Sequence, residues 1–76
     1  MILNDIEEFL KKNKKVEIKL FSLEYIILLE NDNYIIYPKL YSARRNIYKS
    51  YEELINNYTV YNESLVDNAN RIIIVE

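Results

Sequence analysis

No glycine occurs anywhere in this 76-residue chain. Average usage of about 7% would give roughly five in a chain of this length. Phosphate-cradling loops, dinucleotide-binding fingerprints and the nucleophile elbow all depend on glycine, because their backbone must approach a ligand closely or turn through positive φ. These classes of site are therefore excluded. We expect the turns to use asparagine and aspartate, which best tolerate a left-handed backbone.

Cysteine and histidine are absent as well. Disulfides and thiolate sites are impossible, and the common zinc sites are excluded. We therefore expect no cofactor and no metal. Apolar packing must stabilise the fold, and 50% of the residues are hydrophobic. The length predicts a single domain over residues 1–76.

Charge and hydropathy narrow the expected setting. The formal net charge of −2 favours neither a polyanion-binding protein nor a strong nucleic-acid mimic. Charged residues follow the first three too closely for a signal peptide. No apolar run approaches the roughly 20 residues of a membrane span. We expect a cytoplasmic protein with no membrane partner.

A helix is predicted near the start of the chain. Asn4 followed by Glu7 matches the capping-box pattern of a helix N-terminus. An apolar stripe at helical spacing follows, made of Ile6, Phe9 and Leu10. Asn13 is suited to a left-handed exit from the helix.

Three strands are predicted next. Residues 16–20 alternate between apolar and charged side chains, which is typical of a strand with one solvated face. Residues 24–30 are apolar on both faces, as in a central or covered strand. The Asn-Asp-Asn sequence at 31–33 predicts a hairpin turn, and residues 34–37 return antiparallel. Pro38 lacks an N–H donor and ends that strand.

The second half is less regular. Residues 39–49 fit either a short strand after a loop or an irregular arm. Ser50 and Glu53 form a second capping box, which opens a helix that ends at residues 56–57. The pattern of residues 58–61 fits a short strand.

The last segment combines a turn and a strand. Asn62 or Ser64 is suited to cap one turn of helix from Val66 to Ala69. Residues 71–75 predict a final strand that is apolar on both faces.

Together these elements predict an α+β fold. A small, mostly antiparallel sheet of three to five strands carries an N-terminal helix and a second short helix on one face. Two short helices cover only one face of strands that are apolar on both sides. The other face must be covered by the tyrosine-rich segment, by a second copy in a homodimer, or by a partner.

Catalysis is not expected. A serine or threonine nucleophile needs an activating base, most often histidine, and Ser50 is explained as a helix cap. The adjacent carboxylates of Glu52 and Glu53 point roughly 100° apart on a helix. Acidic residues in a first turn are explained by the helix dipole. We therefore predict that the protein is not an enzyme.

The eight tyrosines divide into two groups. Tyr25, Tyr51 and Tyr58 are interpreted as core or core-edge residues whose hydroxyls reach water. Tyr37, Tyr41 and Tyr48 flank Arg44 and Arg45, and tyrosine with arginine is the composition of binding hot spots. The alternative is that both arginines are solvated loop charges.

The same tyrosine and arginine residues raise a second hypothesis, single-stranded nucleic-acid binding. Aromatic rings on a sheet stack on bases, and arginine contacts phosphates. The acidic isoelectric point and the lysine cluster far away in the sequence argue against it.

The sequence "NDIEEFLKKNKKVEIKL" followed by "IILLENDNYIIY", residues 4–20 and 26–37, resembles the opening half of small phage anti-CRISPR proteins that inhibit Cas9. The resemblance implies an N-terminal helix leading into an antiparallel sheet, with Asn31 and Asp32 at the turn that reaches the target. Of the acidic run that mimics nucleic acid in that family, only Glu52 and Glu53 remain here.

We therefore predict a non-catalytic protein-binding module, an inhibitor or regulator from a phage or mobile element that acts on a host protein such as a defence protein. The predicted partner-binding residues are Asn31, Asp32, Tyr37, Tyr41, Arg44, Arg45 and Tyr48.

Overall fold

A five-stranded antiparallel sheet organises the protein, and the computed structural model describes residues 1–75 of it. The order of elements along the chain is α1 (Ile2–Asn13), β1 (Lys15–Leu20), β2 (Leu23–Glu30), β3 (Asn33–Pro38), β4 (Asn46–Tyr48), α2 (Tyr51–Asn57), β5 (Thr59–Val60), β6 (Glu63–Ser64), the 3₁₀ helix η1 (Ala69–Arg71) and β7 (Ile73–Val75).

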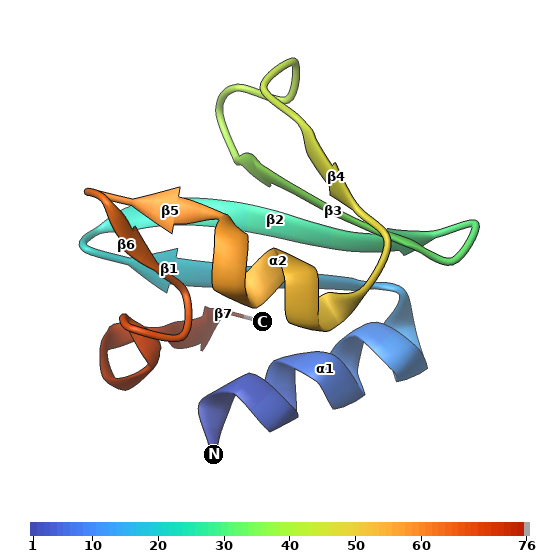
Figure 1. Cartoon of the computed structure of the whole chain (residues 1–76), viewed down its shortest axis with the longest axis horizontal. Helices are drawn as coiled ribbons and strands as arrows, with labels where there is room; N and C mark the ends of the chain where they lie inside the picture. The colour runs from blue at the N-terminus through green and yellow to red at the C-terminus, as the bar shows by residue number, and fades with distance from the viewer. Residues whose placement is uncertain (76) are drawn as a thin grey trace.

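The strands of the main sheet lie in the order β4-β3-β2-β1-β7, and every neighbouring pair is antiparallel. β5 and β6 form a separate two-stranded hairpin. Both helices lie on one face of the main sheet (Figure 1). The predicted α+β class and the antiparallel sheet with two helices on one face are confirmed. Within the described residues, every helix is too short or too polar to cross a membrane.

The start and end of α1 differ from the prediction. The helix begins at Ile2 after Met1, which makes no side-chain cap, so the capping box at Asn4 is wrong. Tertiary contacts explain the longer helix: Leu3 is buried in the core, and the Tyr51 hydroxyl donates to its carbonyl at 2.6 Å. The left-handed exit is at Lys14, with φ 66°, and not at Asn13.

The start of α2 is as predicted. The Ser50 side chain accepts a hydrogen bond from the Glu53 backbone N–H at 3.1 Å, which satisfies one of the free donors of the first turn. Tyr51 and Leu54 then face the core. The helix ends at Asn57, at the predicted boundary.

The segments with ambiguous patterns, residues 39–49 and 62–75, agree with the predictions only in part. Residues 39–45 form an irregular arm, and β4 follows it as a short edge strand, so both alternatives hold in part. The predicted turn of helix from Val66 to Ala69 is confirmed in part: the Asn68 N–H donates to the Ser64 carbonyl at 3.1 Å, which closes one helical turn, and the 3₁₀ helix η1 begins at Ala69. The Ser64 side chain also accepts from the Asp67 N–H at 3.1 Å, as its capping role required. The final strand is shorter than predicted and starts at Ile73.

Three two-residue turns have positive φ at both central residues, as type I′ turns require. Asn31–Asp32 follows the expectation from composition. Phe21–Ser22 and Tyr61–Asn62 do not, because an aromatic residue takes the first left-handed position of each. The strand register explains the Phe21–Ser22 turn: Leu20 pairs with Leu23, so the two residues between them must make the turn whatever their type.

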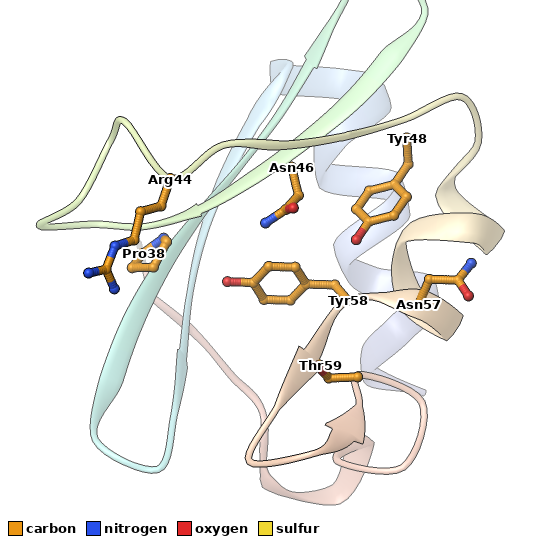
Figure 2. A pocket seen from close by; sticks show the side chains of 7 residues that line it. All are labelled: Pro38, Arg44, Asn46, Tyr48, Asn57, Tyr58 and Thr59. Atoms are coloured by element: carbon orange, nitrogen blue, oxygen red, sulfur yellow. The ribbon is translucent and has the colours of Figure 1, made fainter.

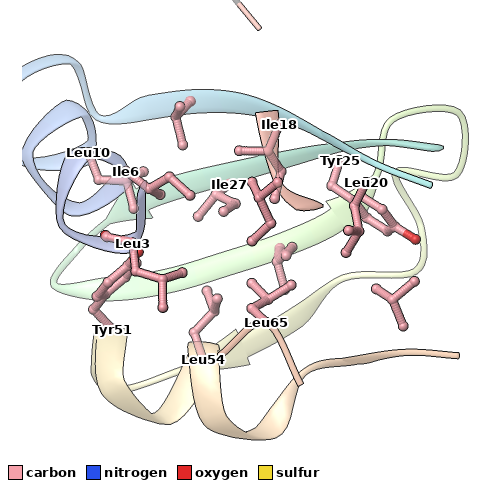
Figure 3. Close-up of a cluster of buried hydrophobic side chains, with 14 residues drawn as sticks. Leu3, Ile6, Leu10, Ile18, Leu20, Tyr25, Ile27, Tyr51, Leu54 and Leu65 are labelled. Carbon is pink, nitrogen blue, oxygen red and sulfur yellow. Dashed lines mark hydrogen bonds between the residues drawn. The ribbon is translucent and has the colours of Figure 1, made fainter. Parts of the chain in front are cut away.

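The core lies between the helices and the sheet (Figure 3). Alternate residues of the strands point into it, including Ile18, Tyr25 and Ile27. The prediction that Tyr25, Tyr51 and Tyr58 belong to the core or its edge is confirmed, since the first two are buried and the third packs against the cluster.

The other face of the main sheet carries no helix (Figure 1). Ile26 and Ile35 are only 4% and 6% exposed, yet they lie outside the main core cluster. Ile26 is paired with Glu17 and with Tyr37 across the neighbouring strands, so their side chains share the face that has no helix. This face, here called the outer face, is thus covered in part by its own side chains.

Candidate functional site

The seven predicted partner-binding residues do not form one surface. They lie in three places: the turn between β2 and β3, the outer face, and the arm (residues 39–45) with the adjoining β4. The turn lies at the opposite end of the β2–β3 hairpin from the arm (Figure 1).

Asn31 and Asp32 form the exposed tip of the β2–β3 hairpin, with φ values of 52° and 65°. After glycine, asparagine and aspartate are the residues that adopt this left-handed conformation most readily. Their identity is therefore explained by the turn itself.

Tyr37 and Arg45 meet on the outer face. The Arg45 guanidinium carbon lies 4.9 Å from the centre of the Tyr37 ring, and its Nε donates to the Ser42 carbonyl at 3.2 Å. Beside them, Lys39 bridges Glu17 at 3.0 Å and Glu24 at 3.4 Å. These hydrogen bonds raise the pKa of Lys39, so it keeps its charge at neutral pH. The two ends of the arm therefore supply part of the cover of the outer face.

Tyr41 and Arg44 contact each other within the arm. The Arg44 guanidinium carbon lies 4.7 Å from the Tyr41 ring centre. Two backbone hydrogen bonds of 2.9 Å fold the arm into successive turns, from Tyr41 N–H to the Pro38 carbonyl and from Arg44 N–H to the Tyr41 carbonyl. Tyr41 remains 54% exposed and its neighbour Leu40 is 87% exposed. The arm thus presents apolar and aromatic area outside the core.

Tyr48 belongs to the core side of the sheet. It pairs with Tyr34 across β3 and β4, and it packs against the edge of the core. Burial raises the pKa of its phenol. Tyr48 therefore has a structural role, although part of its side chain also lines a hollow.

That hollow, here called the polar hollow, has a volume of about 340 Å³. Figure 2 shows its lining: Pro38, Arg44, Asn46, Tyr48, Asn57, Tyr58 and Thr59. Burial, followed by the neighbouring Tyr25 and Tyr48, raises the pKa of Tyr58 to about 12. Because the pKa of Tyr48 is raised as well, the phenols of Tyr48 and Tyr58 both stay protonated at neutral pH and offer O–H donors.

A second hollow of about 480 Å³, here called the apolar hollow, adjoins the first. Its lining shares Pro38 and Arg44 with the polar hollow and adds residues of the β1–β2 turn and the arm: Ser22, Leu23, Glu24, Tyr25, Lys39, Leu40 and Tyr41. Tyr25 of this hollow and Tyr58 of the other touch edge to face, with ring centres 6.0 Å apart. The two hollows together are called the groove below.

Arg44 carries the free positive charge of the groove. The charged residues that line it are Glu24, Lys39 and Arg44, and the first two are paired with each other. Within residues 1–75, no carboxylate lies within 4.0 Å of the Arg44 guanidinium. An ion of opposite sign or a strong hydrogen-bond acceptor would therefore find an uncompensated partner here.

Another aromatic contact was missed by the sequence patterns. Phe21 and Tyr61, from two different hairpin turns, meet edge to face at 5.3 Å, and Arg71 lies 5.6 Å from the Phe21 ring centre. All three arginines of the chain thus lie over aromatic rings. The sequence held one signal for this contact: only residues 21–23 separate the two predicted strands on either side, so Phe21 had to lie in a turn.

Asn46 and Tyr58 were also missed as site residues. Twelve positions separate them, and they reach the same hollow only because β4 pairs with β3 while α2 packs beneath it. No periodicity within either segment marks that meeting point.

Neither a metal centre nor a known relative identifies the protein. Among residues 1–75, no group of three or more carboxylate side chains is placed to hold a metal ion. No protein-family model, curated protein or solved structure matches the chain significantly.

Proposed function

We propose that this protein is a non-catalytic protein-binding module and that the arm with its groove is the binding surface. The observation that carries the proposal is the exposure of Leu40 and Tyr41 beside Arg44, which has no salt bridge to any other residue of the range 1–75. Large aromatic and aliphatic side chains next to arginine are the residues that dominate binding energy at protein interfaces.

Folding does not account for these side chains. Leu40 and Tyr41 lie outside the core cluster, and the arm is held by backbone turns that need neither of them. Exposed apolar area next to a hollow marks an interaction site more often than scattered surface residues do.

The partner that we propose is a host protein, and the action that we propose is inhibition or regulation by a phage or mobile-element protein. The support is the resemblance of residues 4–20 and 26–37 to phage anti-CRISPR proteins. That resemblance directs attention to the Asn31–Asp32 tip, whereas the geometry favours the arm. Mutating the two places separately decides between them.

The test is capture of a protein from a host lysate on the immobilised chain. We expect Tyr41→Ala with Arg44→Ala to remove the captured protein, while Asn31→Gly with Asp32→Gly, which keeps the turn, retains it. Loss of capture only in the tip variant would place the binding surface at the tip. Capture that is equal for all three proteins would contradict a role for either place.

Nucleic-acid binding has weaker support. Arg44 occupies one face of the Tyr41 ring and Arg45 one face of the Tyr37 ring, and bases would stack on such faces. Retention on single-stranded DNA that disappears between low and moderate salt would favour that function instead.

Self-association through the outer face stays a prediction. Ile47 and Ile73 are exposed at its two edges, and Lys39 and Arg45 cover only part of it. Sedimentation velocity at micromolar concentration should show a dimer if a second copy completes the cover, and a monomer if the arm suffices.

A further inference from the structure

We propose that the groove recognises an extended peptide segment of its protein partner in which an acidic residue adjoins a large apolar one. The carboxylate enters the polar hollow, and the apolar side chain enters the apolar hollow. This inference rests on the proposed function and specifies the chemistry of the partner.

The first support is that both hollows are open to one ligand. Pro38 and Arg44 line both, so the two spaces adjoin along these residues. Side chains that follow one another along an extended chain emerge in different directions. A peptide crossing Pro38 can therefore place one side chain in each hollow.

The second support is charge. Glu24 is already paired with Lys39 at 3.4 Å, so Arg44 supplies the net positive charge of the groove. Tyr41 holds the guanidinium at 4.7 Å and limits the conformations that a ligand must select. A planar guanidinium fixed in this way binds a carboxylate with two parallel hydrogen bonds.

The third support is the set of hydrogen-bond donors in the polar hollow. The Tyr48 and Tyr58 phenols remain protonated at neutral pH, and in Figure 2 the Asn46 side chain lies above the Tyr58 ring, between Tyr48 and Arg44. Among the described residues, none of these three side chains forms a hydrogen bond within the chain. Their donors are available to the oxygen atoms of an acidic side chain.

The fourth support distinguishes a peptide from a nucleic acid. Exposed Leu23 and Leu40 line the apolar hollow, and aliphatic side chains offer a base no stacking surface. Among residues 1–75, Arg44 is the one cation of the groove without a carboxylate partner, which allows a single phosphate contact, whereas strand binding needs several. An acidic peptide with an apolar neighbour satisfies both hollows.

The experiment selects ligands without assuming their sequence. A phage-displayed library of random dodecapeptides is panned on the full chain, and enriched peptides are synthesised with a fluorescent label. We expect the enriched sequences to share a glutamate or aspartate beside leucine, isoleucine, phenylalanine or methionine. Fluorescence anisotropy then compares each peptide with its Glu→Gln or Asp→Asn counterpart, and we expect about a tenfold loss of affinity.

The chain offers a matched pair of variants. Arg44→Gln should lower peptide affinity about tenfold, because the carboxylate loses its charged partner. Arg45→Gln removes an adjacent arginine with the same kind of tyrosine contact on the outer face, and it should leave affinity unchanged. Tyr58→Phe should weaken binding roughly threefold through loss of one neutral donor. Equal thermal unfolding of the variants excludes a folding defect as the cause.

Several results would overturn the inference: no enrichment, enriched peptides without an acidic residue, or equal losses in Arg44→Gln and Arg45→Gln. Binding of oligothymidylate that depends on Arg44, with no peptide bound, would assign the groove to nucleic acid. If peptides fail while a captured protein still depends on Tyr41 and Arg44, the proposed function stands and the acidic-peptide chemistry is wrong. If peptides bind as expected while no protein is captured, the groove chemistry stands and the proposed function fails.

Discussion

The exposed residues at the two ends of the β2–β3 hairpin have different physical explanations. At one end, Asn31 and Asp32 make a two-residue turn with positive φ, and both residue types suit that backbone. At the other end, the arm is longer than a connection requires, and it exposes Leu40, Tyr41 and Arg44.

The comparison teaches how to separate folding from function in a small protein. The tip residues follow from backbone conformation, and changing them should affect stability. Neither the backbone conformation nor the core explains why Leu40, Tyr41 and Arg44 are present in the arm, and changing them should affect binding. Both sets were predicted to bind a partner, the tip from the resemblance to anti-CRISPR proteins and the arm from its tyrosine and arginine residues, and the geometry separates them.

The largest expected change in stability comes from the tip. Asn31→Ala with Asp32→Ala should lower the free energy of unfolding by roughly 1–2 kcal/mol, because alanine is disfavoured in the left-handed region. Urea denaturation measures it. Replacement of both residues by glycine is the control and should restore most of the loss. Unchanged stability in the alanine variant would mean that the turn is not strained.

A smaller change is expected at alkaline pH from the arm end. An unfolded tyrosine loses its proton near pH 10, whereas burial raises the pKa of folded Tyr58 to about 12. The contribution of Tyr58 is therefore present below pH 10 and is lost as the pH rises through 12. Partial exposure screens the group, so we expect about 1 kcal/mol.

The measurement compares urea denaturation of the native chain and Tyr58→Phe across this pH range. Tyr51 also has a raised pKa, mainly from burial, and it is present in both proteins, so the difference isolates Tyr58. Parallel curves for the two proteins would show that Tyr58 titrates like a free tyrosine.

The arm itself should matter still less to stability. Tyr41→Ala with Arg44→Ala removes one exposed cation–π contact, which is worth about 0.5 kcal/mol. Thermal unfolding should shift by only about 2–4 °C. A loss of more than about 2 kcal/mol would show that the pair supports the fold, and the contrast between the two ends would disappear.

The smallest effect is expected at the Phe21–Ser22 turn. Phe21→Asn replaces an aromatic residue at positive φ by one that tolerates this conformation, which should stabilise the fold by roughly 1 kcal/mol. It also removes the edge-to-face contact with Tyr61, which is worth a similar amount. The free energy of unfolding should therefore change by less than about 0.5 kcal/mol. A clear gain in stability would mean that the aromatic contact contributes little and that this turn retains strain.

Local patterns were sufficient to predict most of the sheet and the second helix. Alternation placed β1, the two apolar faces identified β2, and the Asn-Asp turn fixed its pairing with β3. Ser50 marked the start of α2 because the capping hydroxyl and the Glu53 N–H that donates to it lie within four residues. These signals are local, so sequence alone reveals them.

The remaining features depend on contacts between distant residues. Packing of Leu3 against Tyr51 extended α1 beyond its capping signal, across a separation of 48 positions. Composition directed attention to Tyr41 and Arg44, whereas Asn46 and Tyr58 join Arg44 at the polar hollow only through the folded sheet. The same composition grouped Arg45 with Tyr41 and Arg44, although the Arg45 guanidinium lies over Tyr37 on the outer face.

The central claim is that binding occurs in the groove beside the arm, and backbone amide chemical shifts measured by NMR test it most directly. Titration of the isotope-labelled chain with an enriched acidic peptide should shift the signals of residues 22–25, 38–46 and 57–59. Signals of the tip and of the outer-face residues Glu17, Ile26 and Ile35 should stay in place. Shifts concentrated at residues 30–33, or along the outer face with the groove unaffected, would contradict the account.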